Sequence, residues 1–167
     1  MKDELTQVDI DKMKEEIEYR RSVLAPKWRD AIKSAKEQGD LSENDEYHSA
    51  RREWRNNESR IAYLEAMIKS AIVVSTDTDV NTIGLFDNVT LYYVEDNETE
   101  VIRVVTTLRN DPSKGNISKE SPLGKAVLGA HKGDTVTVNV NDTCSYEVKI
   151  VDFTKGEDDA SLEISKF

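Results

Sequence analysis

Hydrophobic and polar residues follow two different periods along the chain, and the change falls near residue 75. Before this point, apolar residues recur every three or four positions, as they do on one face of an α-helix. Beyond residue 83 the period becomes two, which is typical of β-strands. The pattern therefore predicts an α+β protein, with a helical domain over residues 1–75 and a sheet domain over residues 80–167.

The first helical stretch begins at Thr6, where TQVD offers an N-cap and places Asp9 three residues later, in the capping-box position. The stretch continues toward Gly39. Pro26 lies inside it and cannot donate a backbone hydrogen bond, so we expect a local kink where the apolar register slips. The apolar positions before the slip are Ile10, Met13, Ile17 and Leu24.

A second helical stretch carries the same pattern through four heptads. Because only a few residues separate the two stretches, we expect an antiparallel coiled-coil hairpin with residues 38–47 at its tip. Arms of about 30 residues would reach roughly 45 Å at ~1.5 Å per residue. Asn57 is the only polar residue of the second seam, where such a residue often fixes helix register. The seam comprises Tyr47, Ala50, Trp54, Asn57, Ile61, Leu64, Ile68 and Ala71.

The second domain contains four segments with strand periodicity. VTLYYV and VIRVVTT predict one hairpin, and TVTVNV and SYEVKIVDF predict another, which together form a small antiparallel sheet. Between the hairpins, SPLGKAVLG predicts a short helix with Ser121 as N-cap, Pro122 at the first position and Gly129 just past the end. Residues 154–167 begin as a polar run that we expect to be solvated, and the pattern leaves open whether ISKF forms a last strand.

The amino-acid composition excludes several classes of protein. A formal net charge of −10 over 167 residues argues against a surface that binds duplex nucleic acid throughout, although a local basic patch stays possible. Cys144 is the only cysteine, which excludes an internal disulfide and a zinc site built from several thiolates. No apolar run resembles a signal peptide or a membrane span, so we expect a soluble, cytoplasmic protein without a membrane partner.

Charges are segregated along the predicted hairpin. Residues 37–46 hold five carboxylates and no base, whereas residues 27–36 and 47–55 together hold seven basic and two acidic residues. A solvated helix surface usually mixes the two signs, so this segregation points to a function. The basic set, here called the basic collar, comprises Lys27, Arg29, Lys33, Lys36, Arg51, Arg52 and Arg55.

Helix capping explains part of the acidic tip. Gly39 suits the end of the first helix, and Ser42 suits the N-cap of the second, with Asp45 in the capping-box position. Capping leaves Asp40 unexplained. Asp40 and Glu43 could instead offer oxygen ligands to Mg²⁺, with the remaining ligands supplied by a partner.

Two segments carry a resemblance to a known family. GDLSENDEYHSAR at the tip and SPLGKAVLGAHKGD in the second domain resemble the Gre family of bacterial transcript cleavage factors. The resemblance implies that the coiled coil enters the secondary channel of RNA polymerase, where the factor stimulates hydrolysis of the RNA 3′ end in backtracked complexes. Asp45 departs from the family pattern, in which a small residue is common.

The resemblance also implies roles for particular residues. Asp40 and Glu43 would be the catalytic pair and would share Mg²⁺ with the polymerase, with no cofactor tightly bound to the factor alone. Lys36, Arg51 and Arg52 would contact the nascent RNA. The second domain would be FKBP-like and would dock on the polymerase of a monomeric accessory factor that is not itself an enzyme. The docking residues would be Ser121, Pro122, Leu123 and Gly124.

Two other functions stay open at this point. A secondary-channel regulator could inhibit RNA polymerase without RNA cleavage. Alternatively, an FKBP-like isomerase or chaperone module could be carried on a coiled-coil handle, with the tip residues serving only as helix caps.

Overall fold

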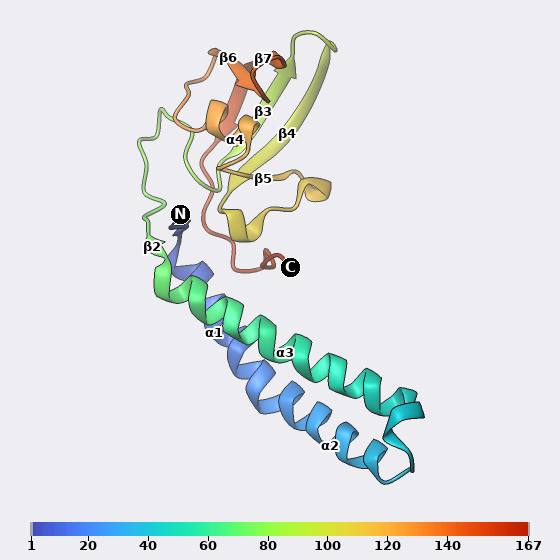
Figure 1. Cartoon of the computed structure of the whole chain (residues 1–167). Coiled ribbons are helices and arrows are strands. Elements are labelled where there is room, and N and C mark those ends of the chain that lie inside the picture. The colour runs from blue at the N-terminus through green and yellow to red at the C-terminus, as the bar shows by residue number, and fades with distance from the viewer. Residues whose placement is uncertain (1, 167) are drawn as a thin grey trace. The chain divides into compact units, whose positions relative to one another are not determined.

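The computed structural model describes residues 2–166, and its contacts divide the chain into two compact units (Figure 1). The helical unit spans residues 10–71. The sheet unit combines the residues up to Asp9 with residues 72–166. The predicted organisation, a helical hairpin followed by a β-sheet domain with a short helix, is confirmed.

The first arm of the hairpin is a helix with one irregular turn. Thr6 caps it as predicted: its Oγ1 accepts the Asp9 N–H at 3.2 Å, and Asp9 Oδ2 accepts the Thr6 N–H at 3.0 Å. The irregular turn is π-helical and lies directly before Pro26, which has no N–H to continue the regular pattern. The expected disturbance is therefore confirmed. The segments are α1 (Gln7–Tyr19), the π-helical turn η1 (Arg20–Leu24) and α2 (Ala25–Lys36).

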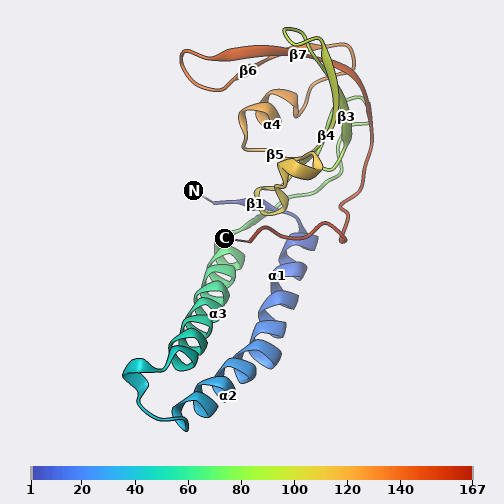
Figure 2. The same cartoon turned by 90° about the vertical axis from the view of Figure 1, so that its right-hand side faces the viewer.

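The second arm is α3 (Asp45–Ser70), and Figure 2 shows it running back alongside α2 and α1 from the connecting loop. Its predicted seam faces the first arm, because Tyr47, Ala50, Asn57, Ile61 and Leu64 are all buried. Trp54 is half-buried. The hairpin is thus held by an apolar seam at heptad spacing, as in other antiparallel coiled coils.

Asn57 is the polar exception in the seam, and it binds the irregular turn of the other arm. Its Nδ2 donates to the Arg20 carbonyl at 3.2 Å, and its Oδ1 accepts from Arg20 Nη1 at 3.1 Å. Glu16 lies beside this pair and bonds both Arg20 Nε at 2.8 Å and the buried Arg60 Nε at 2.9 Å. One polar cluster therefore connects the two arms near their middle.

The sheet unit contains a five-stranded sheet in the order β5-β4-β3-β7-β6. Both predicted hairpins are confirmed, since β3 pairs antiparallel with β4 and β6 with β7. The expectation of a purely antiparallel sheet is wrong, because β5 runs parallel to β4. Two 3₁₀ turns connect β4 to β5. Strand β5 has only three residues, which is too short to show a period in the sequence. The strands are β3 (Asn88–Tyr93), β4 (Glu98–Val105), β5 (Asn116–Ser118), β6 (Thr135–Asn139) and β7 (Ser145–Thr154), and the 3₁₀ turns are η3 (Thr107–Arg109) and η4 (Pro112–Lys114).

The short helix α4 (Pro122–Val127) supplies part of the core of this unit. It begins as predicted, with Ser121 Oγ accepting the Gly124 N–H at 3.0 Å, and Gly129 beyond its end adopts a positive φ of 83°. Val127 is fully buried. The strand residues that are buried in the same core are Val89, Leu91, Ile102, Val104, Val105, Val138, Val148 and Ile150.

Two short strands, one of them near the N-terminus, form a second, two-stranded sheet. β1 (Glu4–Leu5) pairs in parallel with β2 (Ile72–Val73), a pairing that the sequence pattern did not predict. After β7, residues 155–166 form no strand, which answers the question left open for ISKF. Within residues 2–166, none of the helices has the length and apolar character needed to cross a membrane.

Candidate functional site

The tip of the hairpin is a short, hydrogen-bonded turn. Gly39 adopts a φ of 120°, and Asp40 then caps a single 3₁₀ turn, η2 (Leu41–Glu43). Asp40 Oδ1 accepts the backbone N–H of Ser42 at 3.0 Å and its hydroxyl at 2.8 Å. As expected, Asp40 caps neither of the two long helices, but it caps the 3₁₀ turn between them, which the sequence did not predict.

These hydrogen bonds also change the acidity of Asp40. The bond from the Ser42 backbone N–H, followed by the bond from its hydroxyl, holds the pKa of Asp40 below its usual value. Both bonds favour the ionised carboxylate. Asp40 is exposed, so a negative charge is presented to solvent at the tip.

Asn44 is the residue at the tip that sequence reasoning missed. It is the N-cap of α3, where its Oδ1 accepts the Tyr47 N–H at 3.0 Å, whereas Ser42 had been expected in this role. Its Nδ2 donates to the Ala35 carbonyl at 2.7 Å, near the end of α2. Asn44 therefore joins both helices across the turn. Asparagine is as good an N-cap as serine, so its position three residues before Tyr47 was the available signal.

Glu43 ends the 3₁₀ turn that Asp40 begins, and its side chain is exposed. The two predicted catalytic carboxylates thus belong to one turn of the chain. Among residues 2–166, no group of three or more His, Cys, Asp or Glu side chains could hold a metal ion. Carboxylate oxygens suit Mg²⁺, and an ion at Asp40 and Glu43 would need its remaining ligands from elsewhere.

Tyr47 connects two residues of the basic collar to the tip. Lys36 Nζ lies 5.9 Å from the centre of the Tyr47 ring, and Arg51 Nη1 donates to the Tyr47 hydroxyl at 3.3 Å. These two predicted RNA-contacting residues, one from each arm, therefore meet at one buried aromatic ring. Arg52 is exposed on α3. His48 lies edge-on to Tyr47 at 5.4 Å and places its Nε2 3.4 Å from the Ser42 carbonyl.

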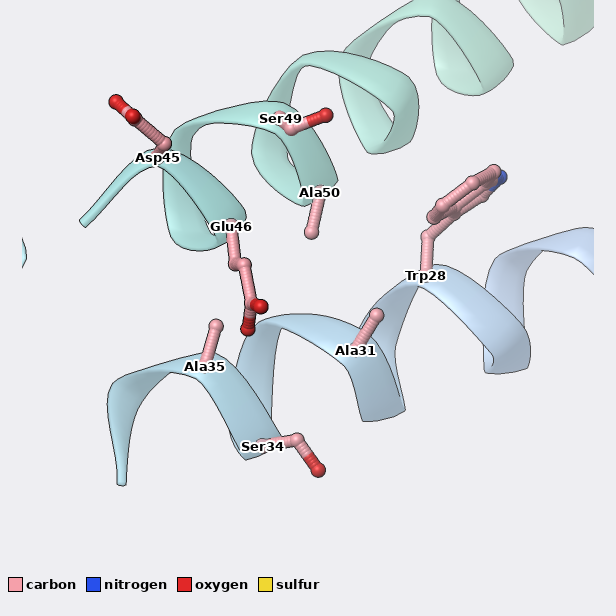
Figure 3. A pocket seen from close by; sticks show the side chains of 8 residues that line it. All are labelled: Trp28, Ala31, Ser34, Ala35, Asp45, Glu46, Ser49 and Ala50. Carbon is pink, nitrogen blue, oxygen red and sulfur yellow. The ribbon is translucent and has the colours of Figure 1, made fainter. Parts of the chain in front are cut away.

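A groove of about 520 Å³ lies between α2 and α3, directly behind the tip (Figure 3). Small side chains line most of it. Figure 3 shows Glu46 pointing toward α2, whereas Asp45 points away from that helix. The extra carboxylate at position 45 therefore faces outward. The lining residues are Trp28, Ala31, Ser34, Ala35, Asp45, Glu46, Ser49 and Ala50.

The four predicted docking residues, Ser121 to Gly124, lie at the start of α4, where they differ in exposure. Pro122 is exposed, Ser121 and Leu123 are half-buried, and Gly124 is buried. A Cβ atom on Gly124 would lie only 2.1 Å from the Ser118 carbonyl oxygen, so this glycine is required for packing. Pro122 is thus the most accessible of the four.

Comparison with known proteins identifies the family. Residues 4–73 match the family model described as "Transcription elongation factor, N-terminal", and residues 77–155 match "Transcription elongation factor, GreA/GreB, C-term". The chain belongs to the GreA/GreB transcription elongation factor family. The tip, the basic collar and Ser121 to Gly124 all fall within the two matched spans of this family.

Individual GreA proteins agree with this assignment. The chain is 37% identical over 150 residues to the transcription elongation factor GreA of Acholeplasma laidlawii, which covers 89% of this chain and 95% of that protein. It is 36% identical to GreA of Macrococcus caseolyticus, over 90% of this chain and 95% of that protein. A solved structure of the transcription factor Gfh1 aligns with 93% of this chain and 99% of its own, at 23% identity and a TM-score of 0.45.

Proposed function

We propose that this GreA/GreB family member binds bacterial RNA polymerase, inserts its hairpin into the secondary channel and stimulates Mg²⁺-dependent cleavage of the RNA 3′ end in backtracked complexes. The observation that carries the proposal is the tip turn. Asp40 and Glu43 are exposed at the two ends of one short turn that hydrogen bonds hold in place. In this role the tip would rescue stalled transcription.

The chemistry of two-metal hydrolysis explains why two carboxylates from the factor would suffice to help bind one Mg²⁺ ion. Hydrolysis of a phosphodiester by two metal ions uses one ion at the attacking oxygen and one at the leaving oxygen. Mg²⁺ is commonly held by one or two protein carboxylates together with water and substrate phosphate. Asp40 and Glu43 would complete the coordination of an ion that the polymerase holds weakly.

The basic collar would act on the RNA. Lys36 and Arg51 are both held against Tyr47, so their cationic groups are placed a short distance from the carboxylate turn. Positive side chains at this place would bind the phosphates of the extruded RNA, and Arg52 could add to the same field. The factor itself would be an accessory protein, active as a monomer, that docks through the segment around Pro122.

The test uses a stalled, backtracked elongation complex with Mg²⁺. Asp40→Asn is the informative variant, because the amide oxygen can still accept the Ser42 N–H while the charge is lost. Glu43→Gln is its counterpart at the other end of the turn. We expect both to bind polymerase as the wild type does and to lose RNA cleavage by at least about 10²-fold, the usual scale for a group that stabilises a transition state directly.

Glu37→Gln serves as the matched control, since it removes an exposed carboxylate outside the turn. It should cleave at the wild-type rate. Normal cleavage by Asp40→Asn would contradict the role given to this residue. Repression of transcription by the wild-type factor without any shortened RNA would instead identify an inhibitory regulator.

A further inference from the structure

The C-terminal tail, residues 155–166, follows β7, and all of it except Lys155 lies beyond the family span that ends at residue 155. The sequence predicts a solvated polar run at its start, and most residues there are exposed, but Gly156 and Asp158 are partly buried. We propose that the tail is a structural strap, which neutralises a buried arginine and thereby fastens the N-terminal segment, residues 2–9, within the sheet unit.

The arginine is Arg109, at the end of the 3₁₀ turn η3. Its side chain is fully buried, with Nε 2.8 Å from Asp9 Oδ1 and Nη1 3.0 Å from Asp158 Oδ1. These contacts are close ion pairs whose atoms are not aligned as hydrogen bonds. Nη1 also donates to the Asp159 carbonyl at 2.9 Å, and the guanidinium lies 5.5 Å from the ring of Phe86.

A charge buried this deeply requires its partners. Removing one partner of a buried ion pair leaves an uncompensated charge, which is far more costly than losing an exposed pair. Asp158 belongs to the tail and Asp9 to the N-terminal segment. The Thr6 hydroxyl bridges them, because it contacts Oδ2 of both Asp158 and Asp9. Arg109 therefore connects three segments that are distant in sequence.

The tail is also fastened at both of its ends. At its start, Lys155 Nζ lies 2.7 Å from Asp87 Oδ2, and the Gly156 N–H donates to Asp87 Oδ1 at 2.9 Å. A Cβ atom on Gly156 would lie 2.0 Å from the Phe86 carbonyl oxygen, so the backbone approaches the core too closely for any other residue. Near its other end, the Ser165 N–H donates to the Leu108 carbonyl at 2.6 Å.

Variants of the full-length chain test the proposal. Asp158→Ala removes one of the two carboxylates that face Arg109 and leaves Asp9 in place, and Glu157→Ala makes the same change in charge at an exposed neighbour. Arg109→Met and Arg109→Met/Asp158→Ala complete a double-mutant cycle, which isolates the interaction between Arg109 and Asp158 because Asp9 is present in every chain. Chemical denaturation of each variant gives its unfolding equilibrium, and hydrogen exchange at the Ser165 amide reports whether the strap is closed.

We expect Asp158→Ala to raise the unfolding equilibrium constant by about 10-fold, because Arg109 loses one charged partner but keeps Asp9. Glu157→Ala should leave it nearly unchanged, and removal of Asp158 should cost much less stability in the Arg109→Met background than in the wild type, because Asp158 then has no arginine to neutralise. Exchange at Ser165 should rise in Asp158→Ala. Should Asp158→Ala fail to fold, comparison of Arg109→Met with the double variant still reports whether removal of Asp158 costs stability once the arginine is gone.

Three outcomes would overturn the proposal. Asp158→Ala could be as stable as Glu157→Ala, which would mean that the tail does not neutralise Arg109. Removal of Asp158 could cost as much stability in the Arg109→Met background as in the wild type, which would locate the effect outside the ion pair. Finally, the Ser165 amide of the wild type could exchange as fast as an unstructured peptide, which would mean that the strap is not closed.

Discussion

Replacement of Asn57 by alanine should loosen the hairpin, because Asn57 is the polar residue that ties the two arms together across the seam. Its side chain is 2% exposed and makes two hydrogen bonds to Arg20. Asn57→Ala removes one bond to a neutral carbonyl, worth about 1 kcal/mol, and one bond from a charged guanidinium, worth about 1.5–3 kcal/mol.

The lower end of that range is the better expectation, because Arg20 keeps other partners. Its Nε stays bonded to Glu16 at 2.8 Å, and its carbonyl still accepts the Ala25 N–H of the π-helical turn. We therefore expect a loss of about 2.5 kcal/mol, which lowers the unfolding midpoint of a chain of this length by roughly 5–10 °C. Circular dichroism during heating, with Asn56→Ala as the exposed neighbouring control, measures this shift.

Asn57→Leu separates stability from register. A leucine buried in the seam returns about 1.5–3 kcal/mol of hydrophobic stabilisation, so the midpoint should recover. Without the contact between Asn57 and Arg20, the arms lose the polar contact inside the seam that helps to distinguish one register from the next, and we expect dimers or mixed species in sedimentation experiments. The reasoning fails if Asn57→Ala melts with Asn56→Ala, or if Asn57→Leu is a single monomeric species.

Two further predictions concern titration. Ser42→Ala removes the hydroxyl hydrogen bond to Asp40 but keeps the bond from the backbone N–H, so an NMR titration of the Asp40 carboxyl should show its pKa rising only part of the way toward the usual value near 3.8; an unchanged pKa would contradict a contribution from the hydroxyl. For Glu16, burial raises the pKa, but hydrogen bonds from Arg60 and Arg20 outweigh burial and lower it below 4.5. The stability that Glu16 provides is therefore present above about pH 4.5 and is lost as the pH falls through the lowered pKa. Glu16→Gln should flatten the acid side of the stability–pH curve, and an equally steep curve in the variant would show that another group dominates.

The elements that the sequence predicted best are those decided by neighbouring residues. The Thr6 capping box, the Ser121 cap and the disturbance before Pro26 each depend on a few positions, and each is confirmed. The cap of α3 was misassigned because Ser42 and Asn44 are both good N-caps. Only the turn geometry at Asp40 decides between them, since it already uses the Ser42 hydroxyl.

Structural features that depend on contacts between distant residues could not be predicted from the sequence. The parallel pairing of β5 with β4 involves three residues and no periodic signal. Arg109 looks like an ordinary surface arginine in sequence, because Asp9 lies 100 positions before it and Asp158 lies 49 positions after it. The residues at the tip already suggested Asp40 and Glu43 as Mg²⁺ ligands, whereas their predicted role as a catalytic pair came from the family resemblance.

Helix capping and metal binding first looked like competing explanations of the acidic tip, but the geometry makes them compatible. Asp40 uses Oδ1 to cap its turn, and the two hydrogen bonds from Ser42 both fix the carboxylate and hold its pKa low. A low pKa means that a cation does not have to displace a proton, and a fixed carboxylate loses less conformational entropy on binding. Asn44 meanwhile ties the turn to α2 through the Ala35 carbonyl. The residues that build the turn are therefore the ones that would prepare Asp40 for the proposed role as a ligand, which is why Asp40→Asn, with its cap kept and its charge removed, separates the two roles.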